Sequence, residues 1–329
     1  MDRRRLVTSI AAASLAGRPA ILRAQATGAA LPRIGVLSFG TAPSGLDPDP
    51  SAGFRDGMRE LGYSAGSNLL LEYRYADGRP DRLARQVEDL VQLKVDVIVA
   101  GGPVALQAAR IATSTIPIVV IGGSDPVREG WAQSLARPGG NVTGFTVTFP
   151  ELGSKQLEIL GQALLGLARV AVILAPAELP KGGPSLEESA GALGLQLQML
   201  EVGGPEDFEA AFTRARQGRA QGLYAVATNT IVSNRSRLAE LSINSRLPAI
   251  SELTLLAEAG FLMSYGADLD ALGRRAATYA ARILRGTRAG DLPVERPSVL
   301  ELVINRRTAR LLGITLPQSV LLRANRLIE

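Results

Sequence analysis

Residues 95–121 read VDVIVAGGPVALQAARIATSTIPIVVI, and this stretch decides the fold class. Its two ends, Val95–Ala100 and Ile118–Ile121, are short, apolar and rich in β-branched residues, as buried strands are. Between them lies Pro103–Ala112, a stretch of helical length that opens with proline, which is favoured at the first helical position. A buried strand, a helix and a second buried strand indicate a parallel βαβ unit.

The same alternation of strand and helix runs along the rest of the chain. Further strands are expected at Arg33–Ser38, Leu69–Tyr75, Val142–Thr148, Val170–Leu174, Gln196–Val202, Leu223–Ala227, Ala249–Ser251, Phe261–Tyr265 and Val299–Asn305. Further helices are expected at Ser51–Leu61, Arg79–Leu93, Leu152–Leu165, Ser185–Leu193, Glu206–Gln217, Ser233–Asn244 and Leu269–Arg285. Continuous apolar strands separated by helices are typical of parallel sheets that are covered on both faces.

Two segments of the chain repeat one order of elements. Residues 33–121 and residues 170–251 each read strand, helix, strand, helix, strand, helix, strand. We therefore predict an α/β protein of two Rossmann-like lobes, with a ligand cleft at the carboxyl ends of the strands. The expected lobes are 31–147 plus about 265–290, and 148–264 plus about 291–329. The lobe that holds residues 299–329 is left open.

Residues 1–26 have the pattern of an export signal. Arg3–Arg5 form a positive head, an apolar run follows, and Ala24-Gln25-Ala26 matches the small-x-small rule of a cleavage site. The run is too short for a stable membrane anchor. An amphipathic first helix is the alternative, but no polar face repeats at helical spacing. We predict cleavage near Ala26 and a periplasmic protein, and the three arginines fit both the ordinary secretory and the twin-arginine route.

Composition excludes several classes of function. The chain has no cysteine and no histidine, which excludes thiol catalysis, thiolate zinc sites and Ser-His-Asp triads. The net charge is +5, but the first 26 residues hold five arginines and one aspartate, so the remainder is close to neutral. Without a basic patch we expect no nucleic-acid partner. Gly101-Gly102 is not a dinucleotide fingerprint, and we expect no cofactor and no metal.

Small, polar and aromatic residues follow the expected strands, where ligands bind in open α/β sheets. Asp125 either pairs with a ligand ammonium or closes an Asx turn. Phe39 and Tyr265 either form a ligand wall or pack in the core. Gly102-Pro103 either binds ligand or only turns the chain into a helix. The composition of these turns suits a small polar or zwitterionic ligand.

Several ordered motifs resemble those of one protein family. They stand at Phe54–Tyr63, Gly78–Leu83, Lys94–Val99, Asp125–Val127, Ser134–Gly144, Leu262–Gly266 and Glu301–Asn305. Through them the chain resembles the ABC-transporter substrate-binding proteins of the tryptophan/tyrosine-type uptake family, from about Arg33 to Glu329. The resemblance implies the type 1 periplasmic-binding-protein fold and no catalysis. It also implies capture of a small ligand, such as an amino acid, by lobe closure, and delivery to a permease and ATPase complex at the inner membrane.

The same resemblance implies which residues contact the ligand. They are Ser38, Phe39, Gly102, Pro103, Val104, Asp125, Thr146, Thr228, Asn229 and Tyr265. Two positions depart from the family pattern: Gly102 replaces a hydroxyl residue before proline, and Ala175-Pro176 replaces Asn-Pro. Both departures leave the identity of the ligand open. Because there is no lipobox cysteine, we expect a free protein rather than a lipoprotein. We also expect a monomer.

Two alternative functions remain open at this point. An exported hydrolase would use the carboxylates Asp125, Glu178 and Glu252, but a glycosidase needs two carboxyl groups facing each other, and nothing in the sequence pairs these three. A sensor-type binding lobe would report to a membrane partner instead of feeding a transporter. The sequence does not separate sensing from uptake.

Overall fold

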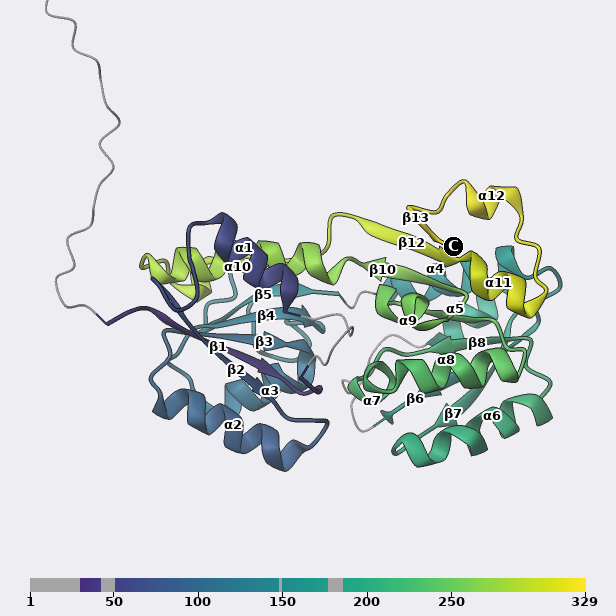
Figure 1. The fold of residues 1–329 in the computed structure, drawn as a ribbon, viewed down its shortest axis with the longest axis horizontal. Helices are drawn as coiled ribbons and strands as arrows, with labels where there is room; N and C mark the ends of the chain where they lie inside the picture. The colour runs from purple at the N-terminus through teal and green to yellow at the C-terminus, as the bar shows by residue number, and fades with distance from the viewer. Residues whose placement is uncertain (1–29, 43–50, 148–149, 177–185) are drawn as a thin grey trace, which may run out of the picture. The chain divides into compact units, whose positions relative to one another are not determined.

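The computed structural model describes residues 30–42, 51–147, 150–176 and 186–329. The predicted export signal at residues 1–26 lies outside the described residues. Pro32–Glu329 forms one compact unit, and its strands are divided between two sheets (Figure 1). Among the described residues, no helix combines the length and the apolar character needed to cross a membrane.

The first sheet has six strands in the order β11-β5-β4-β3-β1-β2. These strands are β1 (Arg33–Ser38), β2 (Leu70–Tyr75), β3 (Val97–Gly101), β4 (Ile118–Gly123), β5 (Val142–Thr146) and β11 (Val294–Glu295). Every pair is parallel, with Ile34 opposite Val97 and Ile98 opposite Ile118. All six carboxyl ends therefore lie at one edge of the sheet.

Alternating side chains of β3 enter two separate cores, one on each face of this sheet. Val97 and Val99 pack with α1 (Ala52–Glu60) and α10 (Leu269–Leu284). Ile98 and Ala100 pack on the other face. That face is covered by α2 (Pro80–Gln92) and α3 (Gly102–Ala112), as Figure 1 shows. The strand-helix alternation in the sequence thus produces a sheet that is buried on both sides.

The second sheet has seven strands in the order β13-β12-β10-β9-β8-β6-β7. These strands are β6 (Arg169–Leu174), β7 (Gln196–Glu201), β8 (Gly222–Ala225), β9 (Ala249–Ser251), β10 (Met263–Ala267), β12 (Leu300–Asn305) and β13 (Arg326–Ile328). The prediction of two α/β lobes is confirmed, but the pair β10–β12 is antiparallel, with Met263 opposite Ile304. β12 enters directly from the first sheet, so no crossover helix sets its direction.

Helices also cover both faces of the second sheet. One face carries α6 (Phe208–Gln217), α7 (Asn229–Ser233), α8 (Arg235–Asn244) and α9 (Thr254–Ala259). The other carries α4 (Pro150–Ala163), α5 (Leu186–Ala192), α11 (Arg306–Leu312) and α12 (Gln318–Leu321). Short 3-10 turns lie at Pro205–Asp207 and Ala289–Asp291. The sequence did not predict β11, β13, α7, α9, α11 or α12, because they are too short for a periodic signal.

The chain passes between the two sheets three times. It leaves the first sheet after β5, returns from β10 into α10, and leaves again after β11. α10 therefore carries residues from late in the sequence back onto the first sheet, where it packs against α1.

Glycines make the contact between α1 and α10 close. A Cβ atom on Gly53 would lie 2.1 Å from the Asp270 carbonyl oxygen, and one on Gly273 would lie 2.7 Å from the Phe54 nitrogen. Gly57 approaches the backbone of α10 in the same way. Contacts this short with backbone atoms leave no room for a side chain, so the two helices pack through their glycines.

We expect Gly53→Ala to lower the free energy of unfolding by about 1–3 kcal/mol, since the helices must separate to admit the methyl group. Gly161→Ala on α4 is the matched control, because a Cβ there would meet no atom within 4 Å. It should leave stability unchanged or raise it by about 0.5–1 kcal/mol. Urea denaturation measures both values. Equal stability of the two variants would show that the α1–α10 contact has room to spare.

Candidate functional site

The loop after β1 contains one half-buried polar side chain and one buried aromatic ring. Ser38 ends the strand, and its Oγ accepts a hydrogen bond from the Gly40 backbone nitrogen at 3.2 Å. Phe39 is 4% exposed and packs in the core with Leu37 and Leu90. Its ring therefore has a packing role, while Ser38 lies at the carboxyl edge of the first sheet.

The turn after β3 has a structural reason for its glycine. Gly102 begins α3 with φ +81°, a left-handed conformation that strains other residues. Pro103 follows at the start of the helix, where its missing N–H leaves no unmet donor. Val104 is half-buried against the core. The turn leaves backbone groups, rather than long side chains, at the edge of the sheet.

Thr146 holds the loop after β4. It is 1% exposed, and its Oγ1 lies 2.9 Å from both the Gly123 and the Ser124 carbonyl oxygens. Ser124 in turn donates a hydrogen bond from its Oγ to Glu129. The Thr146 hydroxyl is thus committed within the protein and fixes the shape of this loop.

Asp125 forms the Asx turn that the sequence left as one of two alternatives. Its Oδ1 accepts hydrogen bonds from the backbone nitrogens of Val127 and Arg128, each at 3.1 Å. The residue is exposed. Its ligand-binding role stays a prediction.

At the end of β8, the chain presents a buried hydroxyl without a partner. Thr228 caps α7 and is 5% exposed, and its Oγ1 has no hydrogen-bond partner within the described part of the chain. Asn229 follows as the first residue of α7 and is half-buried. Leaving a buried hydroxyl unpaired costs about 1–3 kcal/mol, so a ligand atom that forms a hydrogen bond with Thr228 would remove this cost.

A partly buried carboxylate follows β9, between the ends of β8 and β10. Glu252 Oε1 accepts a hydrogen bond from the Ala227 nitrogen at 2.9 Å, and its Oε2 accepts one from Ser251 Oγ at 3.3 Å. Burial raises the pKa of Glu252, although these hydrogen bonds partly oppose the rise. From the sequence, Glu252 was one of the residues that follow a strand and a possible hydrolase carboxylate, but the family resemblance did not place it among the ligand residues.

A buried glutamine ties α4 to two of these strands. Gln156 is fully buried, and its Oε1 accepts a hydrogen bond from the Tyr224 hydroxyl at 2.5 Å. Its Nε2 donates to the carbonyl oxygen of Tyr265, the middle residue of β10, at 2.6 Å. Burial, followed by the charge of Glu252, raises the pKa of Tyr224. No sequence pattern marked Gln156, which is one polar residue on an otherwise ordinary helix.

The close approach of two strand ends also demands a glycine. A Cβ atom on Gly266 would lie 1.9 Å from the Glu252 carbonyl oxygen. Tyr265, directly before it, is half-buried against the core on the α4 face. Glu252 and Tyr265 are therefore held next to each other by their backbones.

Loops from the two sheets approach each other within the unit Pro32–Glu329. A Cβ on Gly40, after β1, would lie 3.9 Å from Ser233 Oγ at the end of α7. The loop after β1 and the last residue of α7 therefore lie near one another. Glu178 lies outside the described residues, and no group of three or more carboxylates within those residues gathers in a metal-binding arrangement.

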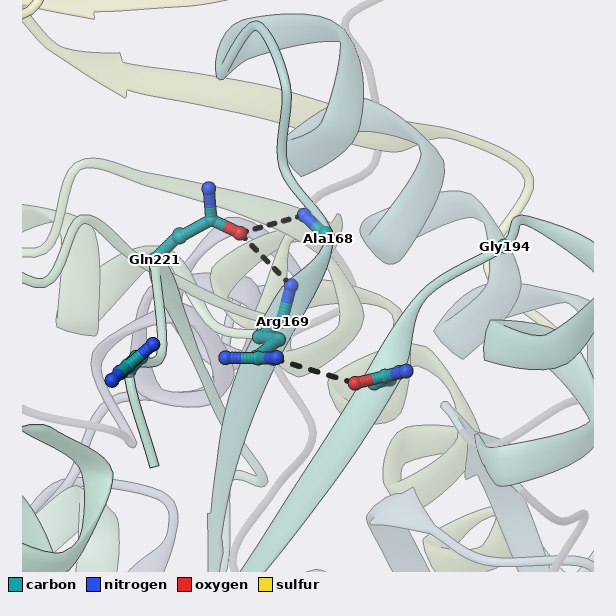
Figure 2. A pocket seen from close by; sticks show the side chains of 6 residues that line it. Ala168, Arg169, Gly194 and Gln221 are labelled. Carbon is teal, nitrogen blue, oxygen red and sulfur yellow. Dashed lines mark hydrogen bonds between the residues drawn. The ribbon is translucent and has the colours of Figure 1, made fainter. Parts of the chain in front are cut away.

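A separate cavity of about 410 Å³ lies where β6 and β7 begin. Figure 2 shows Gln221 there, with its Oε1 accepting hydrogen bonds from the Ala168 and Arg169 nitrogens at 2.8 Å and 3.1 Å. The side chains that line this cavity are exposed, and the cavity lies at the amino ends of the strands. Ligands of open α/β sheets bind at the carboxyl ends, so this cavity is not the candidate site.

The sequence from residue 34 to residue 328 matches the family model described as ABC transporter substrate binding protein. The chain belongs to this family. Substrate-binding proteins of ABC importers bind small molecules and work outside the cytoplasm, and two α/β lobes are the type 1 architecture that the sequence predicted. The resemblance noted from its motifs is thereby confirmed.

Individual relatives agree with this assignment. A protein of Clostridioides difficile (strain R20291) named tyrosine-binding protein is 27% identical over 264 residues, which cover 80% of this chain and 76% of that protein. A crystal structure from Streptococcus pneumoniae of an ABC domain in complex with L-Trp is 25% identical, with a TM-score of 0.80, over 91% of this chain and 100% of that one. A conserved domain protein of Vibrio cholerae is 29% identical with a TM-score of 0.81, over the same shares.

The pKa of Glu252 gives a test that depends on pH. Because burial raises this pKa above its ordinary value of 4.5, the folded state binds the proton more tightly than the unfolded state. The contribution of Glu252 to stability is therefore greatest below about pH 4.5 and is lost as the pH rises through its folded pKa. Glu252→Gln removes this loss. The variant should gain stability relative to the wild type as the pH rises.

Thermal unfolding of both proteins from about pH 4 to about pH 8 measures this difference. Burial also raises the pKa of Asp270. Because Asp270 is present in both proteins, its effect cancels in the difference between their unfolding temperatures. A difference in unfolding temperature that stays constant with pH would mean that Glu252 has the same pKa in the folded and unfolded states.

Proposed function

We propose that this protein captures a small zwitterionic ligand, in the class of the aromatic amino acids, by closing its two lobes and then delivers it to an ABC permease. The observation that carries the proposal is the set of polar residues at the carboxyl edges of both sheets, in a chain that matches the family almost from end to end. The ligand class is supported by the relatives named for tyrosine and crystallised with L-Trp.

The lobes that we propose follow the two sheets. The first comprises residues 32–147 and about 268–296, and the second comprises 150–267 and about 299–329, since β10 pairs in the second sheet and β11 in the first. Three connections between lobes permit a hinge motion that buries the ligand. Compared with the prediction from sequence, the later segment of the first lobe begins about three residues later and ends about six residues later.

The ligand site that we propose uses side chains and backbone groups from both lobes. It keeps Ser38, Gly102, Pro103, Asp125, Thr228, Asn229 and Tyr265 from the sequence prediction. It omits Phe39, Val104 and Thr146, whose packing or hydrogen bonds are internal to the first lobe. Hydrogen-bonding groups around an enclosed cleft suit a small polar ligand, because few directed bonds in a water-poor site give both affinity and orientation.

The biological setting forms part of the same proposal. We propose a periplasmic monomer without catalytic activity, exported by a signal that is cleaved near Ala26, whose partners are a permease and an ATPase at the inner membrane. Amino-terminal sequencing of the exported protein tests the cleavage site. A first residue far from residue 27 would overturn that part.

Isothermal titration of the purified protein with L-tyrosine, L-tryptophan, other amino acids and small polar metabolites tests the function. We expect one ligand per chain and a matching rise in unfolding temperature, since a ligand at 100 times its Kd stabilises the folded state by about 2.7 kcal/mol. Absence of binding across the panel would overturn the ligand class. Chemical turnover of a bound compound would overturn the non-catalytic role.

A further inference from the structure

Glu252 occupies the middle of the carboxyl edge of the second sheet. β9 lies between β8 and β10 in the sheet order, and Glu252 directly follows β9. Its carboxylate bonds to the Ala227 nitrogen at 2.9 Å, just beyond β8. On the other side, the backbone at Gly266 touches the Glu252 backbone so closely that no Cβ fits between them. The side chain thus stands where a ligand of this sheet would bind.

The carboxylate has no cation beside it within the described part of the chain. No arginine or lysine there forms an ion pair with Glu252, and the carboxylate accepts hydrogen bonds from backbone amides, that of Ala227 among them, and from the Ser251 hydroxyl. A carboxylate offers about four acceptor positions, so the group retains capacity for further donors. Desolvating a charge without a counter-ion is unfavourable. A positively charged ligand group placed here would offset that cost.

A second observation at the same edge points to a missing polar partner. Thr228 follows Ala227 directly, so its backbone is one residue from the amide that donates to Glu252. Its Oγ1 is buried and has no hydrogen-bond partner within the described residues. A hydroxyl both donates and accepts, so Thr228 can bond to a polar atom of a ligand that Glu252 attracts.

Asp125 is the other carboxylate that the sequence suggested for a ligand ammonium. It is exposed, and its Oδ1 already accepts two backbone hydrogen bonds. Attraction between exposed charges is weak because water screens it. Glu252 is less accessible to water than Asp125. Two opposite charges attract each other more strongly in such an environment, because less water screens them.

We propose that Glu252 is the specificity-determining residue that pairs with the ammonium group of the ligand, beside the Thr228 hydroxyl. This inference rests on the proposed function, and it restricts the ligand to compounds that carry a protonated amine. A purely structural role, in which Glu252 only holds the Ala227 amide, predicts no preference for amines. The two roles therefore differ in ligand discrimination.

The test compares pairs of ligands with and without the amine. L-tyrosine is paired with 3-(4-hydroxyphenyl)propanoate, and L-tryptophan with 3-indolepropanoate, in titrations of the wild type and of Glu252→Gln. We expect the wild type to prefer the amino acid strongly. The variant should lose about 100-fold or more in affinity for the amino acid, and should bind the analogue with nearly unchanged affinity.

Two further variants control for charge and for the rival site. Glu240→Gln makes the same substitution at an exposed position of α8 and should bind like the wild type. Asp125→Asn should keep the preference for the amino acid. If Asp125→Asn loses that preference and Glu252→Gln keeps it, the ammonium pairs with Asp125 and the inference is wrong. If Glu252→Gln loses affinity equally for the amino acid and for its analogue, Glu252 has a structural role, and the inference is also wrong.

Failure of the proposed function has a different signature. If the wild type binds no amino acid, the ligand class itself is wrong, and the inference falls with it. If Glu252→Gln does not fold, Glu252→Asp retains the charge on a shorter side chain, and it should bind the amino acid more weakly than the wild type while still preferring it to the analogue. A wild type that binds amino acid and analogue equally would overturn the inference without any variant.

Discussion

Parallel strands joined by crossover helices must all run in one direction, which places their carboxyl ends at one edge of the sheet. In this chain that constraint acts twice. In the first sheet it brings the ends of β1, β3 and β4, with Ser38, Gly102 and Asp125, to a common edge although 87 positions separate the first of these residues from the last. In the second it does the same for Thr228, Glu252 and Tyr265. The helices bury both faces of each sheet, so the edges are where backbone and polar groups are available for a ligand.

The second edge combines rigid backbone with polar groups that are not fully satisfied. Gln156 joins α4 to the Tyr224 hydroxyl and the Tyr265 carbonyl, and Gly266 lets β10 lie against Glu252. Within this fixed frame, the Glu252 carboxylate has no cationic partner in the described residues and the Thr228 hydroxyl has none of any kind. Such groups lower the stability of the empty protein, and they are typical of sites whose remaining partner is a ligand. The first edge differs, because Thr146 and Asp125 are engaged in bonds that shape its loop.

The fold was predictable because its signal is long and repeated. Apolar runs such as Val95–Ala100, and the helix-length segments between them, indicated buried parallel strands, and both sheets confirm this. The strand β12 was predicted, but its antiparallel direction was not, since that direction depends on where the chain crosses from the other sheet. Less of the site was predictable. Polar residues at strand ends were recognisable, but whether Phe39 turns into the core, or whether Gln156 is buried against two strands, depends on contacts between residues that are distant in sequence. Glu252 carried no motif, and only its surroundings distinguish it from an exposed acid.

The position of a bound amino acid in a crystal structure of the complex tests the central claim most directly. The account predicts that the ligand lies between the carboxyl edges of the two sheets, with its ammonium within hydrogen-bond distance of the Glu252 carboxylate and a polar atom beside Thr228. A ligand bound at the amino ends of the strands, or one at the carboxyl edges with its ammonium turned away from Glu252, would contradict it.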